Sequence, residues 1–251
     1  MNRRGPVAAG VLFGLWAVVG AVAPTVLPGP LVVAGRLPEL LAPGPGGDAL
    51  GHLTASLLRV VAATSIALAL AVALGVAMAV DDRVGAAVSV WLPFWMAIPT
   101  LVVVLASMVL FGFSDRSVVT AVVVAATPFA TVTVHEGAAD VDPGLLAMAS
   151  AFGADRGSVL REIYLPSILP AVFGSARYLL SMVWKVVVLA ETFGMNRGMG
   201  ALFRFWFNQG DLAALLAALS CFVAVMVGLQ AGVGRLERRL FRPRADAVTG
   251  R

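Results

Sequence analysis

Three charged side chains lie in or beside long apolar stretches, where their chemistry is most unusual. Arg177 and Lys185 interrupt an otherwise apolar segment, and Glu191 follows it. A charged side chain inside a bilayer costs about 2.5–3.5 kcal/mol on insertion scales, so such residues usually face a cavity or a partner. We therefore take Lys185, Glu191 and Arg177 as candidate residues of a solute path, with Lys185 attracting an anion.

Each of the three also has a structural interpretation. For Lys185 the alternative is extension to the outer membrane surface, because its charged end sits on an apolar stem. For Arg177 it is a structural ion pair or a headgroup contact. For Glu191 two alternatives are open, namely ordering of the Gly198–Gly200 loop and simple solvation. Direct pairing of Lys185 with Glu191 is disfavoured, since six residues turn a helix by roughly 600° and leave them about 120° apart.

Metal and thiol chemistry lack the residues they would need. The chain has one cysteine, Cys221, and two histidines, His52 and His135, far apart in sequence. One cysteine excludes an internal disulfide and a multi-thiolate metal site. We expect Cys221 to fill space in an apolar span and both histidines to lie in solvated loops. No cofactor or metal is expected in this chain.

Apolar stretches make up most of the sequence. Of the 251 residues, 60% are hydrophobic and 13% are charged, and the mean hydropathy is +0.93. Soluble domains have about 45–50% apolar and about 25% charged residues, so a soluble globular protein is excluded. We expect an all-α polytopic membrane protein in a lipid bilayer. The net charge of +4 is interpreted as a membrane-orientation signal rather than a nucleic-acid-binding surface.

Six segments are long and apolar enough to cross a bilayer, whose core of about 30 Å requires about 20 helical residues. Pro93 and Pro99 divide a longer uncharged stretch, Val84–Ser114, into a short interfacial helix and a span. The expected transmembrane helices are Val7–Leu27, Val60–Val80, about Ala97–Phe113, Ser117–Val134, Ser167–Leu189 and Leu212–Val233.

The arginines indicate the orientation of these spans. Eleven fall on the side of the termini and four on the opposite side, namely Arg36, Arg116, Arg197 and Arg204. Basic residues concentrate in cytoplasmic loops, so both termini are expected in the cytoplasm. The N-terminal apolar run followed by Ala21–Ala23 imitates a signal peptide, but Pro24 directly afterwards disfavours cleavage.

Two extracytoplasmic loops have distinctive compositions. Residues 24–52 hold six of the fourteen prolines, which excludes a continuous span, and a short amphipathic piece is expected at Leu31–Leu41. Thr192–Gly210 contains the aromatic run Phe203–Phe207 around an arginine. Such a run is typical of the headgroup layer, so we expect an interfacial anchor there, and Arg59 at the outer membrane surface.

The longest cytoplasmic connection, residues 135–166, has the pattern of two short helices. Asp142 precedes a proline and is placed to cap the first helix, and Gly153 is placed to end it in a left-handed conformation. A second helix is expected from near Asp155 until just before Pro166. Both would expose apolar stripes, which indicate docking to a partner protein. The stripes are Leu145, Ala149 and Phe152, then Val159, Leu160, Ile163 and Tyr164.

A sequence motif spans this loop, because Gly153 is followed after nine residues by Ile163, Tyr164, Leu165 and Pro166. It resembles the coupling loop of permease subunits of binding-protein-dependent type I ABC importers. There, Glu-Ala-Ala, three residues, Gly and nine residues precede Ile-x-Leu-Pro. The motif glutamate corresponds to Ala147, whereas the similar triplet that begins at Glu136 lies eleven residues too early. The resemblance assigns coupling to an ATPase to Ala147, Ala149, Phe152, Gly153, Leu160, Ile163, Leu165 and Pro166.

Weaker matches extend over residues 20–240, at Leu27–Pro30, Arg59, Ile98–Pro99, Ser175–Tyr178, Ala190–Thr192 and Gly198–Gly200. They resemble the sulfonate, taurine and nitrate branch of these permeases, whose relatives import thiamine precursors. The resemblance implies one transmembrane domain over residues 1–251 in a bacterial cytoplasmic membrane. It implies a small organic or inorganic anion as substrate, with a thiamine precursor or another small nutrient as the alternative.

The resemblance also implies partners: a second copy of the permease, two cytoplasmic ABC ATPase subunits that hold ATP and magnesium, and an extracytoplasmic solute-binding protein. The residues agree with a separate ATPase. A phosphate loop requires Gly-Lys-Ser/Thr, and the only lysine, Lys185, stands between Trp184 and Val186. The chain is therefore expected to be a translocation subunit and not an enzyme, switching by rigid-body alternating access when the ATPases close.

Two other classes of protein explain less of the sequence. An ion-coupled secondary transporter would use Lys185, Glu191 and Arg177 as a charge relay, but it leaves the two apolar-striped loop helices unexplained. An intramembrane enzyme needs a catalytic pair within the spans, and the sequence has no Ser-Lys pair, paired aspartates or histidine cluster at suitable spacing.

Overall fold

The computed structural model describes residues 4–248, and the regular elements in that range are all helical, which confirms the all-α prediction. Arg3 and Arg251, which contribute to the charge count, lie outside the described residues. The chain divides into two compact units. The first comprises residues 1–56 and 191–227, and the second comprises residues 57–190 and 228–251.

The first unit contains residues 24–52 and Thr192–Gly210, the two loops for which an extracytoplasmic position is predicted. Two short helices replace the expected amphipathic piece, and Pro30 opens the first of them at a position where no intrahelical N–H is required. The Trp16 indole donates to the carbonyl oxygen of Pro28 at 2.9 Å, which ties this loop to the first helix. The helices are α1 (Arg4–Val22), α2 (Pro30–Gly35), α3 (Leu37–Leu41), the start of α4 (Ala49–Val80), α11 (Met199–Asn208) and the start of α12 (Leu212–Val248).

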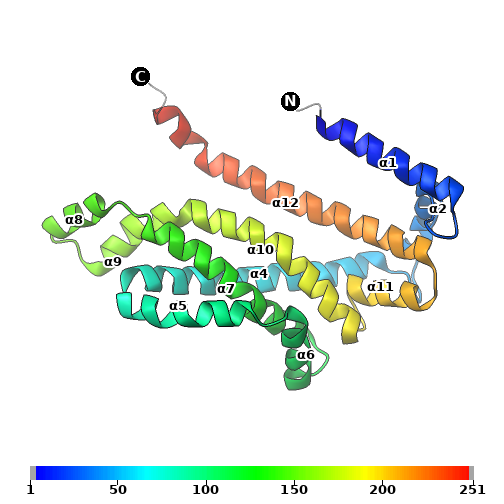
Figure 1. Ribbon diagram of the computed structural model, residues 1–251, viewed down its shortest axis with the longest axis horizontal. Coiled ribbons are helices and arrows are strands. Elements are labelled where there is room, and N and C mark those ends of the chain that lie inside the picture. The colour runs from blue at the N-terminus through cyan, green and yellow to red at the C-terminus, as the bar shows by residue number, and fades with distance from the viewer. Residues whose placement is uncertain (1–3, 249–251) are drawn as a thin grey trace. The chain divides into compact units, whose positions relative to one another are not determined.

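The second unit holds the motif loop. In Figure 1, α8 and α9 lie beyond the end of α7 and the start of α10. Its helices are most of α4, α5 (Asp82–Met96), α6 (Thr100–Phe111), α7 (Asp115–Ala139), α8 (Pro143–Ala151), α9 (Arg156–Ser158), a π-helical segment (Val159–Tyr164), most of α10 (Leu165–Gly194) and the end of α12.

Four helical stretches are long and apolar enough to cross a membrane: Ala49–Val80, Asp115–Ala139, Arg156–Gly194 and Leu212–Glu237. The helices α5 and α6 pass the same test only together, and they are bent by 95° at the break between them. In α1, the apolar stretch Gly10–Val22 is shorter. The described residues thus hold four or five candidate spans, and the count of six with cytoplasmic termini stays a prediction.

The expected continuous span Ala97–Phe113 is replaced by this bent pair. With 12 residues, α6 is about 18 Å long, well short of a bilayer core of about 30 Å. Pro99 has an extended backbone (φ −58°, ψ 125°) at the N-cap of α6. Proline also disfavours a helical conformation in the residue before it, so the chain bends between the two helices.

The helix α4 begins at Ala49, well before the predicted Val60, and therefore contains Arg59. The Arg59 side chain is buried, and its Nη2 lies 2.6 Å from Oδ1 of Asp115 at the start of α7. Arg59 thus lies in a helix contact with an ion partner from a distant segment, and its expected place at the outer membrane surface stays a prediction.

Glycines let the helices around the motif loop approach closely. A Cβ at Gly75 of α4 would lie 2.9 Å from the backbone nitrogen of His135, and one at Gly137 of α7 would lie 2.5 Å from Cβ of Ala171. Beside these contacts, a buried cluster joins α4, α7 and α10; it consists of Val76, Val134, Ala138, Val141, Tyr164 and Ile168.

We expect Gly75→Leu to destabilise the protein by about 1–3 kcal/mol, since the added side chain must displace the α7 backbone. The measurement is the thermal unfolding temperature of the purified protein in detergent. Gly174→Leu is the matched control, because a Cβ at this helical glycine meets nothing within 4 Å. Equal shifts for both variants would contradict the close-packing argument.

Candidate functional site

The first helix of the motif loop forms as the sequence predicts. Oδ1 of Asp142 accepts the backbone N–H of Gly144 at 2.8 Å, and Pro143 occupies the first turn of α8. After the helix ends, Gly153 has φ +71° and donates its N–H to the carbonyl oxygen of Ser150 at 3.0 Å. The cap and the left-handed glycine fix where the chain turns back toward α9.

The second helix does not stop before Pro166 as expected. The chain is helical from Arg156 to Gly194, with a π-helical segment at Val159–Tyr164. Here the N–H of Leu165 donates to the carbonyl oxygen of Leu160, five residues back. Pro166 has no N–H to donate, and the wider preceding turn lets the helix continue through it.

Asp155 caps the start of this helix. The hydroxyl of Ser158 and the backbone N–H groups of Ser158 and Gly157 donate to its carboxylate and hold its pKa below the ordinary value. A depressed pKa means that the cap is fully stabilising above the unfolded value of about 3.9 and is lost as the pH falls through the folded pKa.

We therefore expect Asp155→Ala to speed amide hydrogen exchange at Gly157 and Ser158 at pH 7. The difference from the wild type should persist at the unfolded pKa of about 3.9 and shrink only at lower pH, as the wild-type carboxylate is protonated at its depressed folded pKa. Asp155→Asn, which keeps one acceptor oxygen, is the control and should show a smaller change. Exchange that is equally fast in all three proteins at pH 7 would contradict the capping role.

Several residues assigned to ATPase coupling surround one hollow of about 210 Å³ between α8 and the π-helical segment. Ala149, Phe152 and Ile163 line it, and the Phe152 side chain is 85% exposed. Ala147 is exposed on α8 but does not line it. The complete lining is Leu145, Met148, Ala149, Phe152, Ala154, Ser158, Val159, Glu162 and Ile163.

The remaining coupling residues lie around this hollow. Leu160 and Leu165 border a second, apolar hollow against α4, and Pro166 is half-buried. Gly153 forms the turn between the two helices. The buried Tyr164 and Ile168 anchor the segment on α4 and α7. The motif residues thus shape a loop that is fixed at its base and exposes an apolar surface.

The candidate path residues do not form one cluster. Arg177 is paired with Glu237 of α12, and Gln230 of α12 donates to the hydroxyl of Ser181 at 3.3 Å. These contacts hold α10 and α12 together in the second unit. They match the structural interpretation of Arg177, and its assignment to a path stays a prediction.

Lys185 is exposed on α10, while Val183 and Val187 on either side of it are fully buried. A step of two residues turns an α-helix by about 200°, so Lys185 lies on the face that this chain leaves uncovered. Its Nζ is 5.8 Å from the ring centroid of the neighbouring Trp184. An uncovered lysine in an apolar helix is accommodated by water, a path, a partner subunit or extension to the membrane surface, so the assignment of Lys185 to a path stays a prediction.

Glu191 is fully buried in the first unit. The hydroxyl of Ser56 donates to its two oxygens at 2.9 and 2.8 Å, and the N–H of Gly200 donates to Oε2 at 2.9 Å. The Ser56 hydroxyl in turn accepts the N–H of Met199 at 2.8 Å. The carboxylate therefore holds the glycine loop between α10 and α11 against α4, and its role in a solute path stays a prediction.

His52 belongs to the same arrangement, which corrects its expected place in a solvated loop. It lies near the start of α4, and its Nδ1 is 2.8 Å from the carbonyl oxygen and 3.1 Å from the nitrogen of Gly198. His135 is likewise half-buried within α7. Helices extend beyond the apolar pattern at both positions, and this extension removes the histidines from loops.

The aromatic segment Phe203–Phe207 belongs to α11 and is tied into the first unit. Arg204 donates to the carbonyl oxygens of Thr192 at 3.1 Å and Met195 at 2.9 Å, at the end of α10. The Trp206 indole donates to the carbonyl oxygen of Gly46 at 2.9 Å, whereas Phe207 is exposed. Arg204 thus satisfies helix-end carbonyls, and only part of this run is free to act as an interfacial anchor.

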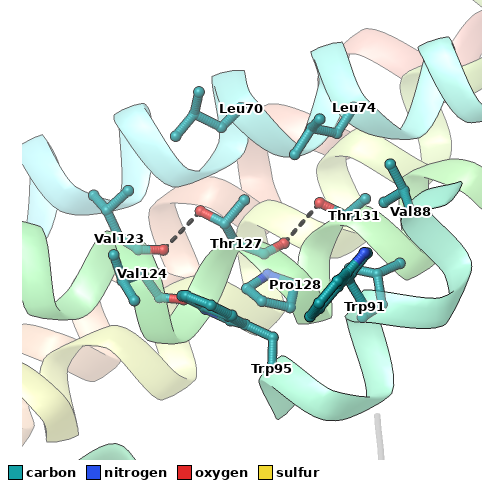
Figure 2. A pocket seen from close by; sticks show the side chains of 11 residues that line it. Leu70, Leu74, Val88, Trp91, Trp95, Val123, Val124, Thr127, Pro128 and Thr131 are labelled. Atoms are coloured by element: carbon teal, nitrogen blue, oxygen red, sulfur yellow. Dashed lines mark hydrogen bonds between the residues drawn. The ribbon is translucent and has the colours of Figure 1, made fainter. Parts of the chain in front are cut away.

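A further hollow of about 290 Å³ lies between α4, α5 and α7 of the second unit, and it is open to the outside because Trp91 and Leu70 in its lining are exposed. Figure 2 shows Trp91 and Trp95 of α5 on one side and Leu70 and Leu74 of α4 on another. The hydroxyl groups of its two threonines donate to carbonyl oxygens of their own helix. The cavity is therefore a mainly apolar, aromatic-lined space whose threonine hydroxyls are already engaged.

Comparison with known proteins decides the family. The family described as the binding-protein-dependent transport system inner membrane component matches residues 66–242. This chain belongs to that family. It is a permease of a type I ABC importer, located in the inner membrane. Permease subunits of this kind are transport components rather than enzymes, and they work with ATPase and binding-protein partners.

Individual relatives support the assignment. The permease is 28% identical to a probable ABC transporter permease protein of Brucella melitensis (74% of this chain, 75% of the relative). It is 26% identical to the taurine transport system permease protein TauC of Escherichia coli (92% and 86%). It is 30% identical to the riboflavin transport system permease protein RibX of Chloroflexus aurantiacus (86% and 80%).

Solved structures support the fold of the permease. A chain of the MetNI methionine ABC transporter in an inward-facing conformation has a TM-score of 0.67 at 18% identity, covering 75% of this chain and 94% of that one. A chain of an amino acid ABC transporter has a TM-score of 0.59 at 14% identity, covering 76% and 93%.

Three important residues of the permease escaped sequence reasoning. Ser56 holds Glu191, Asp115 neutralises Arg59, and Glu162 lines the hollow of the motif loop. Asp115 follows the Ser114 capping position of α7, where an acidic residue is favoured for local reasons alone. No local signal distinguishes Ser56 from other serines in apolar helices.

Proposed function

We propose that this permease is the transmembrane subunit of an ATP-driven importer that carries a small anion of the sulfonate, taurine or nitrate type across the cytoplasmic membrane. The taurine permease of Escherichia coli and the putative aliphatic sulfonates permease of Bacillus subtilis, each aligned over 92% of this chain, support this substrate class. The observation that carries the proposal is the uncovered Lys185 on α10, which would supply a positive charge to the path.

The complete importer would contain two copies of the permease, two ATPase subunits and one extracytoplasmic binding protein. In this arrangement each motif loop docks on one ATPase, and ATP binding drives alternating access. Six spans per permease would place both termini in the cytoplasm. The exposed apolar side chains of α8 support the docking, because a water-facing surface of this kind is stabilised by a partner.

A second substrate class has its own support. The riboflavin permease of Chloroflexus aurantiacus is 30% identical, and the cavity of Figure 2 is lined mainly by apolar and aromatic side chains, with its threonine hydroxyls already engaged. A neutral heteroaromatic nutrient, such as a thiamine precursor, is therefore the alternative cargo.

Proteoliposomes containing the permease, its ATPase and its binding protein would test both proposals. Uptake of a panel of sulfonates, taurine, nitrate and thiamine precursors is measured together with ATP hydrolysis. Anion uptake that requires ATP and binding protein supports the first proposal, and selective uptake of the heteroaromatic compounds supports the second. Uptake without the ATPase would contradict an ATP-driven importer.

Lys185→Gln is expected to lower anion uptake roughly tenfold, because one favourable charge contact of about 1.4 kcal/mol is lost along the path. Lys185→Arg keeps the charge and serves as the control. Basal ATP hydrolysis should be unchanged in both variants, which separates transport from coupling. Unchanged anion uptake in Lys185→Gln would remove Lys185 from the path.

A further inference from the structure

The hollow between α8 and the π-helical segment contains one acidic side chain among mainly apolar neighbours. Leu145, Met148 and Phe152 contribute from α8 and its end, and Val159 and Ile163 contribute from the opposite segment. Glu162 belongs to the same lining. The hollow therefore combines walls that bury hydrocarbon with one group that binds a cation.

The other carboxylates of the loop have local roles. Asp142 accepts the N–H of Gly144, and Asp155 accepts the N–H groups of Gly157 and Ser158. By contrast, Glu162 is exposed and has no ion-pair partner within the described part of the chain. Its carboxylate is therefore available to a group from outside this chain.

The backbone beneath Glu162 is held in place. Tyr164 and Ile168, which follow it, are buried against α4 and α7, and Ile163 packs on the same cluster. The N–H of Leu165 donates to the carbonyl oxygen of Leu160 across the wider π-helical turn. A fixed backbone lowers the entropy lost when a partner binds, so a single charge here contributes more than on a mobile loop.

We propose that this hollow receives a lysine or arginine side chain of the ATPase subunit, and that Glu162 is its ion-pair partner. The inference rests on the proposed function and adds a residue to it. Long cationic side chains have an apolar stem and a charged end. The stem matches the walls formed by α8 and the π-helical segment, and the charged end matches the carboxylate.

The same geometry gives Glu162 a role that the sequence motif does not assign. The motif glutamate is replaced by Ala147, whose methyl group cannot pair with a cation and which does not line the hollow. The acidic contact of the coupling loop thus moves from the α8 surface to the opposite side of the hollow.

The test measures the dissociation constant between the full permease in nanodiscs and its ATPase subunit at several salt concentrations. Glu162→Gln is expected to raise this constant about tenfold and to flatten its salt dependence, and Glu162→Lys is expected to raise it further. Glu136→Gln is the matched control, because Glu136 is exposed on α7 and does not line the hollow. Thermal unfolding temperatures should be equal in all variants, since both side chains are exposed.

Two results would overturn the inference. In the first, the wild-type permease binds the ATPase, but Glu162→Gln either binds as tightly as the wild type or is weakened no more than the control Glu136→Gln. The hollow then does not receive a cation, and the proposed function stands. If the wild-type permease does not bind an ABC ATPase at all, the proposed function fails and the inference fails with it.

Discussion

Gly153→Pro is expected to abolish ATP-driven uptake, lowering it at least a hundredfold, while the membrane helices remain folded. Gly153 has φ +71°, which proline, fixed near −65°, cannot adopt. Its N–H also donates to the carbonyl oxygen of Ser150, and proline has no N–H. The turn between α8 and α9 must therefore open, and the hollow formed by the two sides of the loop is lost.

Uptake and stimulated ATP hydrolysis in proteoliposomes should fall together in this variant. A graded series provides the control. Gly153→Asn should retain most activity because asparagine tolerates a left-handed conformation, and Gly153→Ala should be intermediate. A Cβ at this position meets no atom within 4 Å, so the series reports on backbone conformation alone. Full activity of Gly153→Pro would show that the loop conformation is irrelevant to transport.

Glu191→Ala is expected to give the largest loss of stability in the first unit, roughly 3–5 kcal/mol. The substitution leaves the Ser56 hydroxyl and the Gly200 N–H without their acceptor in a buried site, and unpaired buried donors cost about 1–3 kcal/mol each. A loss of that size lowers the unfolding temperature by roughly 6–20 °C in a protein of this length.

Unfolding followed in detergent by differential scanning fluorimetry would measure this change. Glu39→Ala is the control, because Glu39 is an exposed glutamate of the same unit whose pair with Arg36 contributes little. Gly198→Ala should reproduce the Glu191 phenotype, since a Cβ there would overlap the Glu191 carboxylate and φ is +125°. If Glu191→Ala and Glu39→Ala unfold at the same temperature, Glu191 does not anchor the loop.

Local signals in the motif loop predicted its first helix correctly. Asp142 and Gly153 act within a few residues of themselves, so a cap and a left-handed turn are visible without tertiary information. Pro166 was misinterpreted as a helix stop. Proline usually ends a helix, but here a π-helical turn that packs against α4 and α7 accommodates it. That compensation depends on partners far along the chain.

The geometry of the bent pair α5 and α6 also could not be predicted from local sequence signals. Pro93 and Pro99 indicated a break, yet composition gave no information on the angle of 95° or on the shortness of α6. His52 was expected in a solvated loop because polarity in isolation predicts exposure. It lies in α4 instead and is half-buried against Gly198, and the buried Arg59 is paired with Asp115; both partners are distant in sequence.

By itself, the sequence determined the membrane class, the helical fold, the motif loop and the family, because each depends on composition, on short-range periodicity or on a spacing of a few residues. Only the tertiary structure decided that Glu191 is held by Ser56, that Arg177 is paired with Glu237, and that Glu162 lines a hollow. A charged side chain is placed by the partners that compensate its desolvation. Those partners come from other helices, and their proximity is fixed by packing rather than by sequence distance.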